Sequence, residues 1–384
     1  MIPNTLFMGF MTLYMLELGV TLSQVGMISA LGLIVHIVLA FASPFITDKL
    51  GRRYASLIFD FIGWSGAVLI WAVAQNIYFF VAAAIVNAFF RVVANSWHCL
   101  MLEDSEPGTR VHIFTFLQFA SIIAGFFAPL GALLVSSMSL VPAMRVMLIF
   151  ALISKSSLFI LRHFFTTETE IGRQRMQEMK GVSIRDVFSS YVPVVKRIAG
   201  DRALIISLLL RALNFSQLTV RTTFLAVLVT QHLGFPAETV AVFHLVNAIV
   251  MLLVLLLITP VLAQFTGRWP ISLGICFHVA ATVILLISPP SQNMPLLIVS
   301  AVLIALGTAI ASPRIDALVA NTIVNEERSV ANAIMSVFLL LITTPFAYMG
   351  GVLSEIDVRL PFLMTLGIFL VCLVMLYVAK GRVK

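Results

Sequence analysis

Long apolar runs, separated by short polar turns, constrain this chain more than any other feature. About 20 apolar residues are needed to cross the roughly 30 Å hydrocarbon core of a bilayer. Twelve such runs can be counted along the 384 residues. Because lipid offers the backbone no hydrogen-bond partner, and because the runs lack the alternation of barrel strands, they predict helices. We therefore expect an all-α membrane protein with twelve transmembrane helices.

The first predicted span is shorter than the others. At about 1.5 Å per residue it reaches about 27 Å. A start placed too late, a fragment and a short helix all fit this length. The twelve predicted spans lie at 2–18, 24–46, 55–74, 77–101, 112–136, 141–163, 203–230, 237–262, 270–288, 295–320, 329–352 and 360–379.

Composition argues against a soluble fold. Hydrophobic residues make up 60% of the chain and charged residues 11%, with a mean hydropathy of +1.07. Soluble domains carry about 25% charged residues, so this chain has too little polar surface to face water on all sides. The net charge of +7 sits mainly in short loops on one side, which indicates membrane topology and no nucleic-acid partner.

The distribution of Lys and Arg predicts the orientation. Cytoplasmic loops are enriched in these residues, whereas the opposite side carries few. Only Arg145 and Arg359 fall on the poor side. We therefore expect a multi-pass protein of the plasma (cell inner) membrane, with the central loop and the C-terminus in the cytoplasm. The rich side carries Lys49, Arg52, Arg53, Arg110, the central loop, Arg268, Arg328, Lys380, Arg382 and Lys384.

One long polar stretch, residues 164–202, divides the spans into six and six. It predicts a cytoplasmic central loop between an N-terminal six-helix bundle at 1–163, whose first helix is shortened, and a C-terminal six-helix bundle at 203–384. Sequence similarity between the halves supports this division, since 43–56 parallels 259–272 at an almost constant offset. Two halves related by an axis along the membrane normal place a binding site between them, near the midplane.

The loop after the second span carries a specific motif. It reads Pro44-x-x-x-Asp48-Lys49-x-Gly51-Arg52-Arg53. This closely resembles the signature of the major facilitator superfamily, with Pro44 where the first glycine usually stands. The second-half copy is weaker, with Gln264 for the acid and Trp269 for the last base. The resemblance covers essentially the whole chain and implies the fold of that family, two pseudo-symmetric six-helix bundles.

The resemblance also implies a role for this loop. Asp48 is expected to face the end of helix eleven, and Arg52 or Arg53 to pair with acids at the end of helix four. Such a cluster would latch the halves together on the cytoplasmic side in the outward-facing state. The alternative is that its basic residues only anchor the topology. The expected latch comprises Asp48, Lys49, Gly51, Arg52, Arg53, Glu103, Asp104 and Arg110.

Polar residues within spans are the candidates for a substrate site, because ionisable groups in a bilayer are costly. Two stripes at helical spacing stand out, on helices four and seven, which line the cavity in the resembled family. The alternative is that the stripes hydrogen-bond neighbouring helices. The predicted cavity residues are Asn87, Arg91, Asn95, Arg211, Asn214, Gln217 and Arg221.

The deep charges are mainly positive, which favours an anionic substrate or one rich in hydrogen-bond acceptors. Lys155 is either a cavity or an interface residue. Asp60 and Asp316 are the candidates for proton coupling, the default in this family. No metal site or cofactor is predicted, and Cys99, Cys276 and Cys372 are expected to pack in apolar surroundings.

These features predict a secondary active transporter that works by alternating access, acts as a monomer and is not an enzyme. No G-x-x-x-x-G-K-(S/T) run is present, so ATP is not expected to be the direct energy source. Proton-coupled efflux of a drug-like or metabolite compound is the first hypothesis, because the loop motif and Gly125-x-x-Ala128-Pro129-x-Gly131 resemble exporters. Uptake of a sugar, peptide or organic anion, and a non-transporting scaffold or receptor, are the alternatives.

Overall fold

The computed structural model describes the chain except for residues 106, 183, 259–267, 291–292, 321–327 and 379–384. Side chains next to these gaps, including those of 107–111, 184–190 and 328–332, are also outside the description. Every regular element in the described part is a helix. Eleven helices there are long and apolar enough to cross a membrane. They correspond to predicted spans two to twelve.

The first half contains the first six predicted spans. Several of them are built from consecutive helical pieces. These elements are α1 (Ile2–Phe7), η1 (Met8–Phe10), α2 (Met11–Glu17), α3 (Leu22–Leu50), α4 (Arg52–Asp60), η2 (Phe61–Gly66), α5 (Ala67–Ala72), α6 (Ile77–Ala88), α7 (Phe90–Leu102), α8 (Pro107–Gly125), α9 (Ala128–Met138) and α10 (Leu140–Phe165).

Two polar helices, α11 (Glu170–Glu178) and α12 (Ile184–Gly200), lead to the second half. The second half contains six further spans. Its elements are α13 (Arg202–Val227), η3 (Leu228–His232), η4 (Ala237–Thr239), α14 (Val240–Leu253), η5 (Val254–Ile258), α16 (Trp269–Ile287), α17 (Met294–Ala320), α18 (Arg328–Ile356) and α19 (Leu360–Val378).

The predicted first span is present as three consecutive helical pieces, α1, η1 and α2. The chain turns through the 3-10 segment η1 and then continues as α2. Gly9 lies in this turn, where an added Cβ would be only 2.5 Å from Nε2 of His244. A side chain at position 9 would therefore require the His244 ring to move, and glycine is also a weak helix former.

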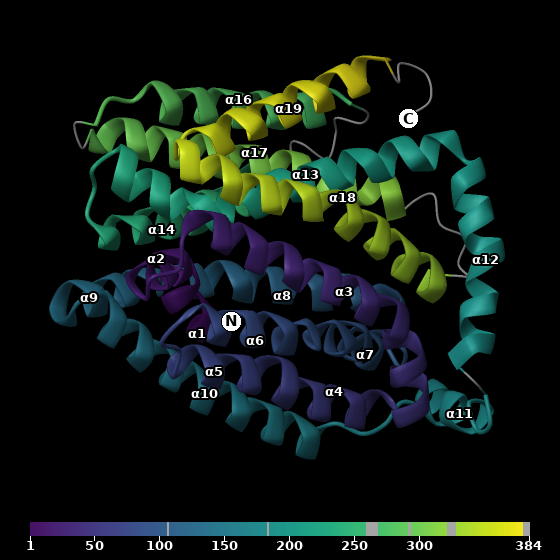
Figure 1. Ribbon diagram of the computed structural model, residues 1–384. Coiled ribbons are helices and arrows are strands. Elements are labelled where there is room, and N and C mark those ends of the chain that lie inside the picture. Colours follow the sequence, from purple (N-terminus) through teal and green to yellow (C-terminus); the bar gives the residue numbers. More distant parts are fainter. Residues whose placement is uncertain (106, 183, 259–267, 291–292, 321–327, 379–384) are drawn as a thin grey trace.

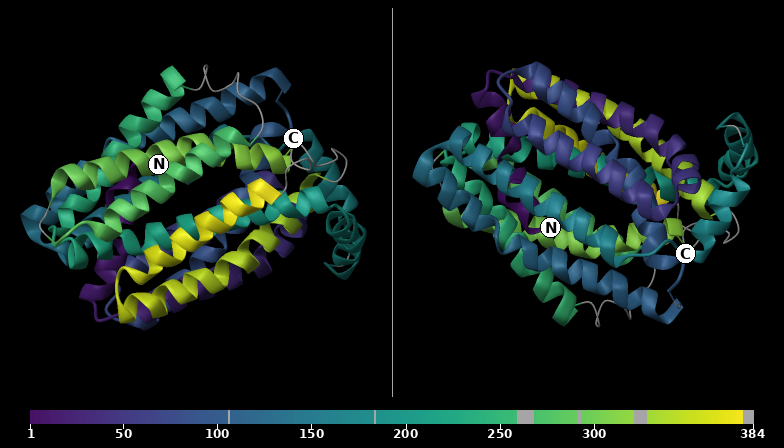
Figure 2. Two further views of the ribbon diagram at one scale, coloured as in Figure 1. Left: turned by 90° about the horizontal axis from the view of Figure 1, so that it is seen from above. Right: turned by 90° about the horizontal axis from the view of Figure 1, so that it is seen from below.

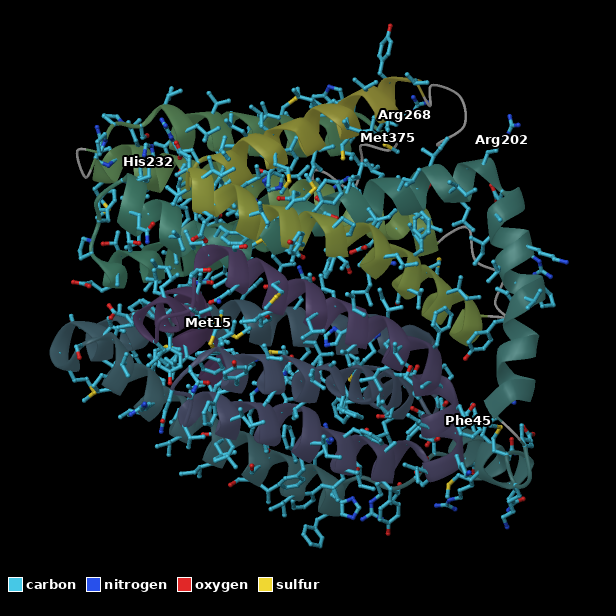
Figure 3. The ribbon with its side chains drawn as sticks, in the orientation of Figure 1. Met15, Phe45, Arg202, His232, Arg268 and Met375 are labelled. Carbon is cyan, nitrogen blue, oxygen red and sulfur yellow. The ribbon has the colours of Figure 1, made fainter. Side chains whose placement is uncertain are left out.

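The two halves lie against each other, and α12 stands across the ends of both (Figure 1). In the two turned views, α11 and α12 also lie together at one end (Figure 2). We call this the basic end, because it carries Arg52 and Arg202, and we call the other the far end. Figure 3 shows Arg202 at the basic end and His232 at the far end.

At the far end the halves are tightly packed. One hydrophobic cluster there includes Phe10 and Tyr14 from the first half and Phe224 from the second. The Thr12 hydroxyl donates to the Thr223 carbonyl at 2.7 Å, which joins α2 to α13. This end is therefore closed by buried apolar contacts and a bond between the halves.

Two long helices, α3 and α18, run along each other and join the halves at the far end. The backbone N–H of Ser23 at the start of α3 donates to Oε2 of Glu355 at 2.8 Å. One turn further, an added Cβ on Gly26 would lie 2.6 Å from the Cα of Gly351. The two backbones touch here because neither residue carries a side chain, as is common where membrane helices cross closely.

Candidate functional site

The polar residues predicted on helix four have different surroundings. The Asn87 amide donates to the Gly63 carbonyl at 3.0 Å, and the Asn95 amide donates to the Thr47 hydroxyl at 3.2 Å. Both bonds join neighbouring helices of the first half. Arg91 lies between them on the helix and is half-buried. No side-chain ion pair or hydrogen bond forms between Arg91 and the described residues.

Arg91 belongs to α7 in the first half. Its guanidinium is close enough to that of Arg211 for the two charges to repel. One charge thus comes from each half, since Arg91 belongs to α7 and Arg211 to α13. The pair therefore marks a place where a solute could touch both halves at once.

Arg211 is held by a carboxylate from the neighbouring helix. Its Nε atom lies 2.8 Å from Oδ1 of Asp316 on α17. The two side chains are 36% and 57% exposed, although each lies within a span. An exposed pair of this kind can exchange partners more readily than a buried one.

A chain of polar bonds continues from Arg211 along α13. The Asn214 amide donates to the Ser312 hydroxyl at 3.3 Å, and the Gln217 amide donates to Oδ1 of Asn214 at 3.3 Å. Oε1 of Gln217 is buried and has no partner in the described part of the chain. A buried acceptor without a partner is costly.

Arg221 points into the second half. Its Nη1 donates to Nδ1 of His278 on α16 at 3.1 Å, and its Nη2 donates to the Thr308 hydroxyl at 3.5 Å. Since arginine only donates, His278 carries its proton on Nε2. The imidazole stacks on Phe369, with ring centroids 5.1 Å apart and planes 4° apart. Arg221 thus joins helices of one half.

The signature loop forms a compact charged cluster at the basic end. Arg52 is only 3% exposed, yet its guanidinium reaches Asp48 at 2.8 Å and Glu103 at 3.0 Å. Asp104 next to Glu103 is exposed. The side chains of Arg110 and of the beginning of α18 lie outside the described residues, and the expected contact between Asp48 and helix eleven falls there too.

Sequence reasoning missed a third acid in this cluster. Oε1 and Oε2 of Glu168 accept hydrogen bonds from the backbone N–H groups of Arg52 at 3.0 Å and Arg53 at 2.9 Å. A carboxylate at the first turn of α4 is favourable because those N–H groups have no partner within the helix. Gly51 has φ +84°, which positions α4 for this contact. The sequence feature that could have identified Glu168 is the acidic run before α11, in which Thr169 is the helix cap.

Of the two candidates for proton coupling, Asp60 is buried and already paired. It is 2% exposed and bonded to Nη2 of Arg162 on α10. Nearby, Lys155 is 9% exposed, and its Nζ lies 3.1 Å from the centroid of the Trp64 ring. Together these residues form a charged network within the first half, away from the Arg91–Arg211 interface. Arg162 was not singled out from the sequence.

Comparison with known proteins identifies the architecture. The sequence matches the model of the Major Facilitator Superfamily over residues 1–292 and, in an overlapping match, 212–384. No curated protein matches it. The fold is similar to that of the nucleoside transporter NupG, with a TM-score of 0.70, 14% identity, and coverage of 99% of this chain and 96% of that one. The structure of a NupG point mutant gives the same TM-score and identity, with coverage of 100% and 97%.

A further solved structure shares the fold. The human organic anion transporter MFSD10 (TETRAN) has a TM-score of 0.62 and 14% identity, with coverage of 98% of this chain and 97% of that one. At such low identity these likenesses show the fold alone.

Proposed function

Because the chain belongs to the major facilitator superfamily, we propose that it moves a small solute by rocking its two halves around the Arg91–Arg211–Asp316 site. One observation carries this proposal. Arg91 of the first half and Arg211 of the second are within electrostatic range of each other, and the Arg211–Asp316 ion pair is exposed while apolar contacts join the halves at the far end. A site reached from one side at a time is what alternating access requires.

The basic end is proposed to face the cytoplasm. Arg52, Arg202 and the polar helices α11 and α12 all lie there. Cytoplasmic loops carry an excess of Lys and Arg. The described conformation is then open to the cytoplasm, as expected for a protein of the plasma (cell inner) membrane that takes up its cargo from inside. We keep proton-coupled efflux by a monomer as the working hypothesis.

Asp316 is the better candidate for the coupling carboxylate. It is 57% exposed and bonded to Arg211 at the interface between the halves. A proton or a solute can therefore reach it during turnover. Asp60, by contrast, is 2% exposed and bonded to Arg162 inside one half. We propose that Asp316 takes part in coupling and that Asp60 has a structural role.

The site favours an anionic solute, or one with several hydrogen-bond acceptors. Arg91 and Arg211 both supply guanidinium donors, which bind carboxylates and phosphates in a forked geometry. Asp316 balances only one of these charges.

Ligand-induced thermal stabilisation of the purified protein tests this proposal. A library of anionic metabolites and drugs would be compared between the parent and Arg91→Ala. At 100 times its Kd a ligand stabilises the folded state by about 2.7 kcal/mol. We expect this stabilisation to be lost in Arg91→Ala and kept in Arg359→Ala, which changes an exposed arginine at the far end.

Flux of the best ligand into proteoliposomes completes the test. Transport that collapses in Arg91→Ala supports a carrier with this site. Equal stabilisation of parent and variant would show that Arg91 is structural. A ligand that binds without any flux would favour a receptor or scaffold built on the same fold.

A further inference from the structure

Arg268, which belongs to the second copy of the signature motif, lies at a cleft on the surface of the second half. Arg268 precedes α16, and its Nη1 donates to the Leu376 carbonyl near the end of α19 at 2.8 Å. Figure 3 shows Arg268 beside Met375 of α19. The cleft has a volume of about 280 Å³ and is lined by Arg268, Ser272, Leu373, Leu376 and Tyr377.

The two copies of the loop use their arginines differently. In the first half, Arg52 is 3% exposed and surrounded by Asp48 and Glu103. In the second half, Arg268 lines a cleft and bonds a backbone carbonyl. Trp269 replaces the base that follows Arg52 and is 62% exposed. The second copy therefore presents an arginine and an aromatic ring at the surface.

The cleft combines the two chemistries of a phospholipid. Arg268 and Ser272 supply hydrogen-bond donors that suit a phosphate. Leu373 and Leu376 continue the cleft along α19 as an apolar wall, which suits the beginning of an acyl chain. The arrangement matches a lipid in a leaflet, because Arg268 lies at the basic end of α16 and Leu373 lies about one turn deeper than Leu376 on α19.

The position of the cleft agrees with this occupant. Arg268 is next to the first residue of α16, and Tyr377 is next to the last residue of α19, so the cleft lies at the membrane–water boundary. Trp269 and Tyr377 are 62% and 75% exposed. Tryptophan and tyrosine concentrate at this boundary, where their rings lie among lipid headgroups.

The positive charge at and near the cleft favours a lipid with an anionic headgroup. Three more basic residues, Lys380, Arg382 and Lys384, directly follow α19 in the sequence. Clusters of Lys and Arg next to the cytoplasmic end of a membrane helix attract anionic headgroups. We propose that the cleft between α16 and α19 binds an anionic phospholipid of the leaflet at the basic end. This site is separate from the Arg91–Arg211 interface and does not depend on which solute is carried.

Native mass spectrometry of the detergent-purified protein tests the proposal. Phosphatidylglycerol and phosphatidylcholine with the same acyl chains would be titrated onto the parent, Arg268→Gln and Arg202→Gln. Arg202 is an exposed basic residue at the same end and serves as the matched control. We expect phosphatidylglycerol to bind the parent about tenfold more tightly than phosphatidylcholine, a preference lost in Arg268→Gln and kept in Arg202→Gln.

A second variant guards against a folding defect in Arg268→Gln. Leu373→Trp keeps the arginine and fills the apolar part of the cleft, so it should weaken binding of phosphatidylglycerol. An equal preference in all variants would overturn the proposal, as would equal affinity of the parent for both lipids. The last measurement is competition between inorganic phosphate and phosphatidylglycerol. If it competes fully at millimolar concentration, the cleft is a simple anion site and the lipid proposal fails.

Discussion

The Nη2 atom of Arg52 lies 3.0 Å from Oε1 of Glu103, and the Nε atom of Arg52 also donates to both carboxylate oxygens. This bond joins the loop after α3 to the end of α7. Oε2 of Glu103 in turn accepts from the Thr169 hydroxyl, so the central loop is bound to the same carboxylate. The Arg52–Glu103 pair thus connects the loop after α3, the end of α7 and the central loop, which are distant in sequence.

Glu103→Gln is predicted to destabilise the protein. The variant leaves the Arg52 guanidinium, which is 3% exposed, with one carboxylate in place of two. Removing one partner of a buried ion pair typically costs about 3–5 kcal/mol, and the remaining bond to Asp48 should limit the loss to about 2–3 kcal/mol. Thermal unfolding in lipid nanodiscs measures it. Asp104→Asn, which changes the exposed neighbouring acid, is the matched control and should have little effect.

Gly26→Ala is predicted to loosen the far end. The added Cβ would lie 2.6 Å from the Cα of Gly351, so α3 and α18 would have to move apart. Overpacking of this kind costs about 1–3 kcal/mol. Gly367→Ala on α19 is the control, because no atom outside its own helix lies within 4 Å of an added Cβ. A cysteine crosslink between α3 and α18 near this crossing should slow in Gly26→Ala and be unchanged in Gly367→Ala.

Asp60→Asn is predicted to lower stability, whereas Asp316→Asn is predicted to remove the proton dependence of flux. Asp60→Asn leaves Arg162 without its buried carboxylate and should cost about 3–5 kcal/mol of stability. Replacing both partners, as Asp60→Asn with Arg162→Gln, should recover part of this loss. Asp316 is 57% exposed, so its replacement should cost below about 1 kcal/mol while removing the proton dependence of flux. A stable Asp60→Asn protein with uncoupled transport would reverse these assignments.

Tyr191→Phe is predicted to weaken the attachment of α12. The Tyr191 hydroxyl donates to the Phe41 carbonyl at 3.2 Å, and the two rings stack with centroids 6.2 Å apart. The same helix packs on α18 in the second half through Val194. Losing the hydrogen bond should cost about 1 kcal/mol. Thermal unfolding measures the loss, and Tyr78→Phe, at a position 78% exposed, should have no effect.

Tyr191 also predicts a pH dependence at the alkaline limit. Burial, with a smaller contribution from Asp48, raises the pKa of Tyr191 to about 12. The folded state therefore favours the neutral phenol. Its contribution is complete below about pH 10, the pKa of an exposed tyrosine, and is lost as pH rises through about 12. Unfolding measured on both sides of pH 10 should show this loss in the parent and not in Tyr191→Phe.

Much of the architecture could be predicted from local sequence. Runs of about 20 apolar residues must form helices, because a backbone in lipid can bond only to itself. Predicted spans two to twelve accordingly correspond to the eleven long apolar helices. The signature motif and the family match over the whole chain agree with this fold. The first span is helical as well, but local periodicity does not reveal its 3-10 segment η1, where Gly9 lies close to His244 of a distant helix.

The candidate site shows where sequence stops being informative. Spacing placed Arg211, Asn214, Gln217 and Arg221 on one helix face, but not against particular neighbours. The tertiary structure decided that Arg211 meets Asp316 at the interface, whereas Arg221 meets His278 inside the second half. It also brought Glu168 to the first turn of α4. The sequence by itself determined which segments are helices and which residues share a face, since those depend on backbone hydrogen bonds and helical period. Which face meets which neighbour depends on packing between distant segments, and only the tertiary structure could decide it.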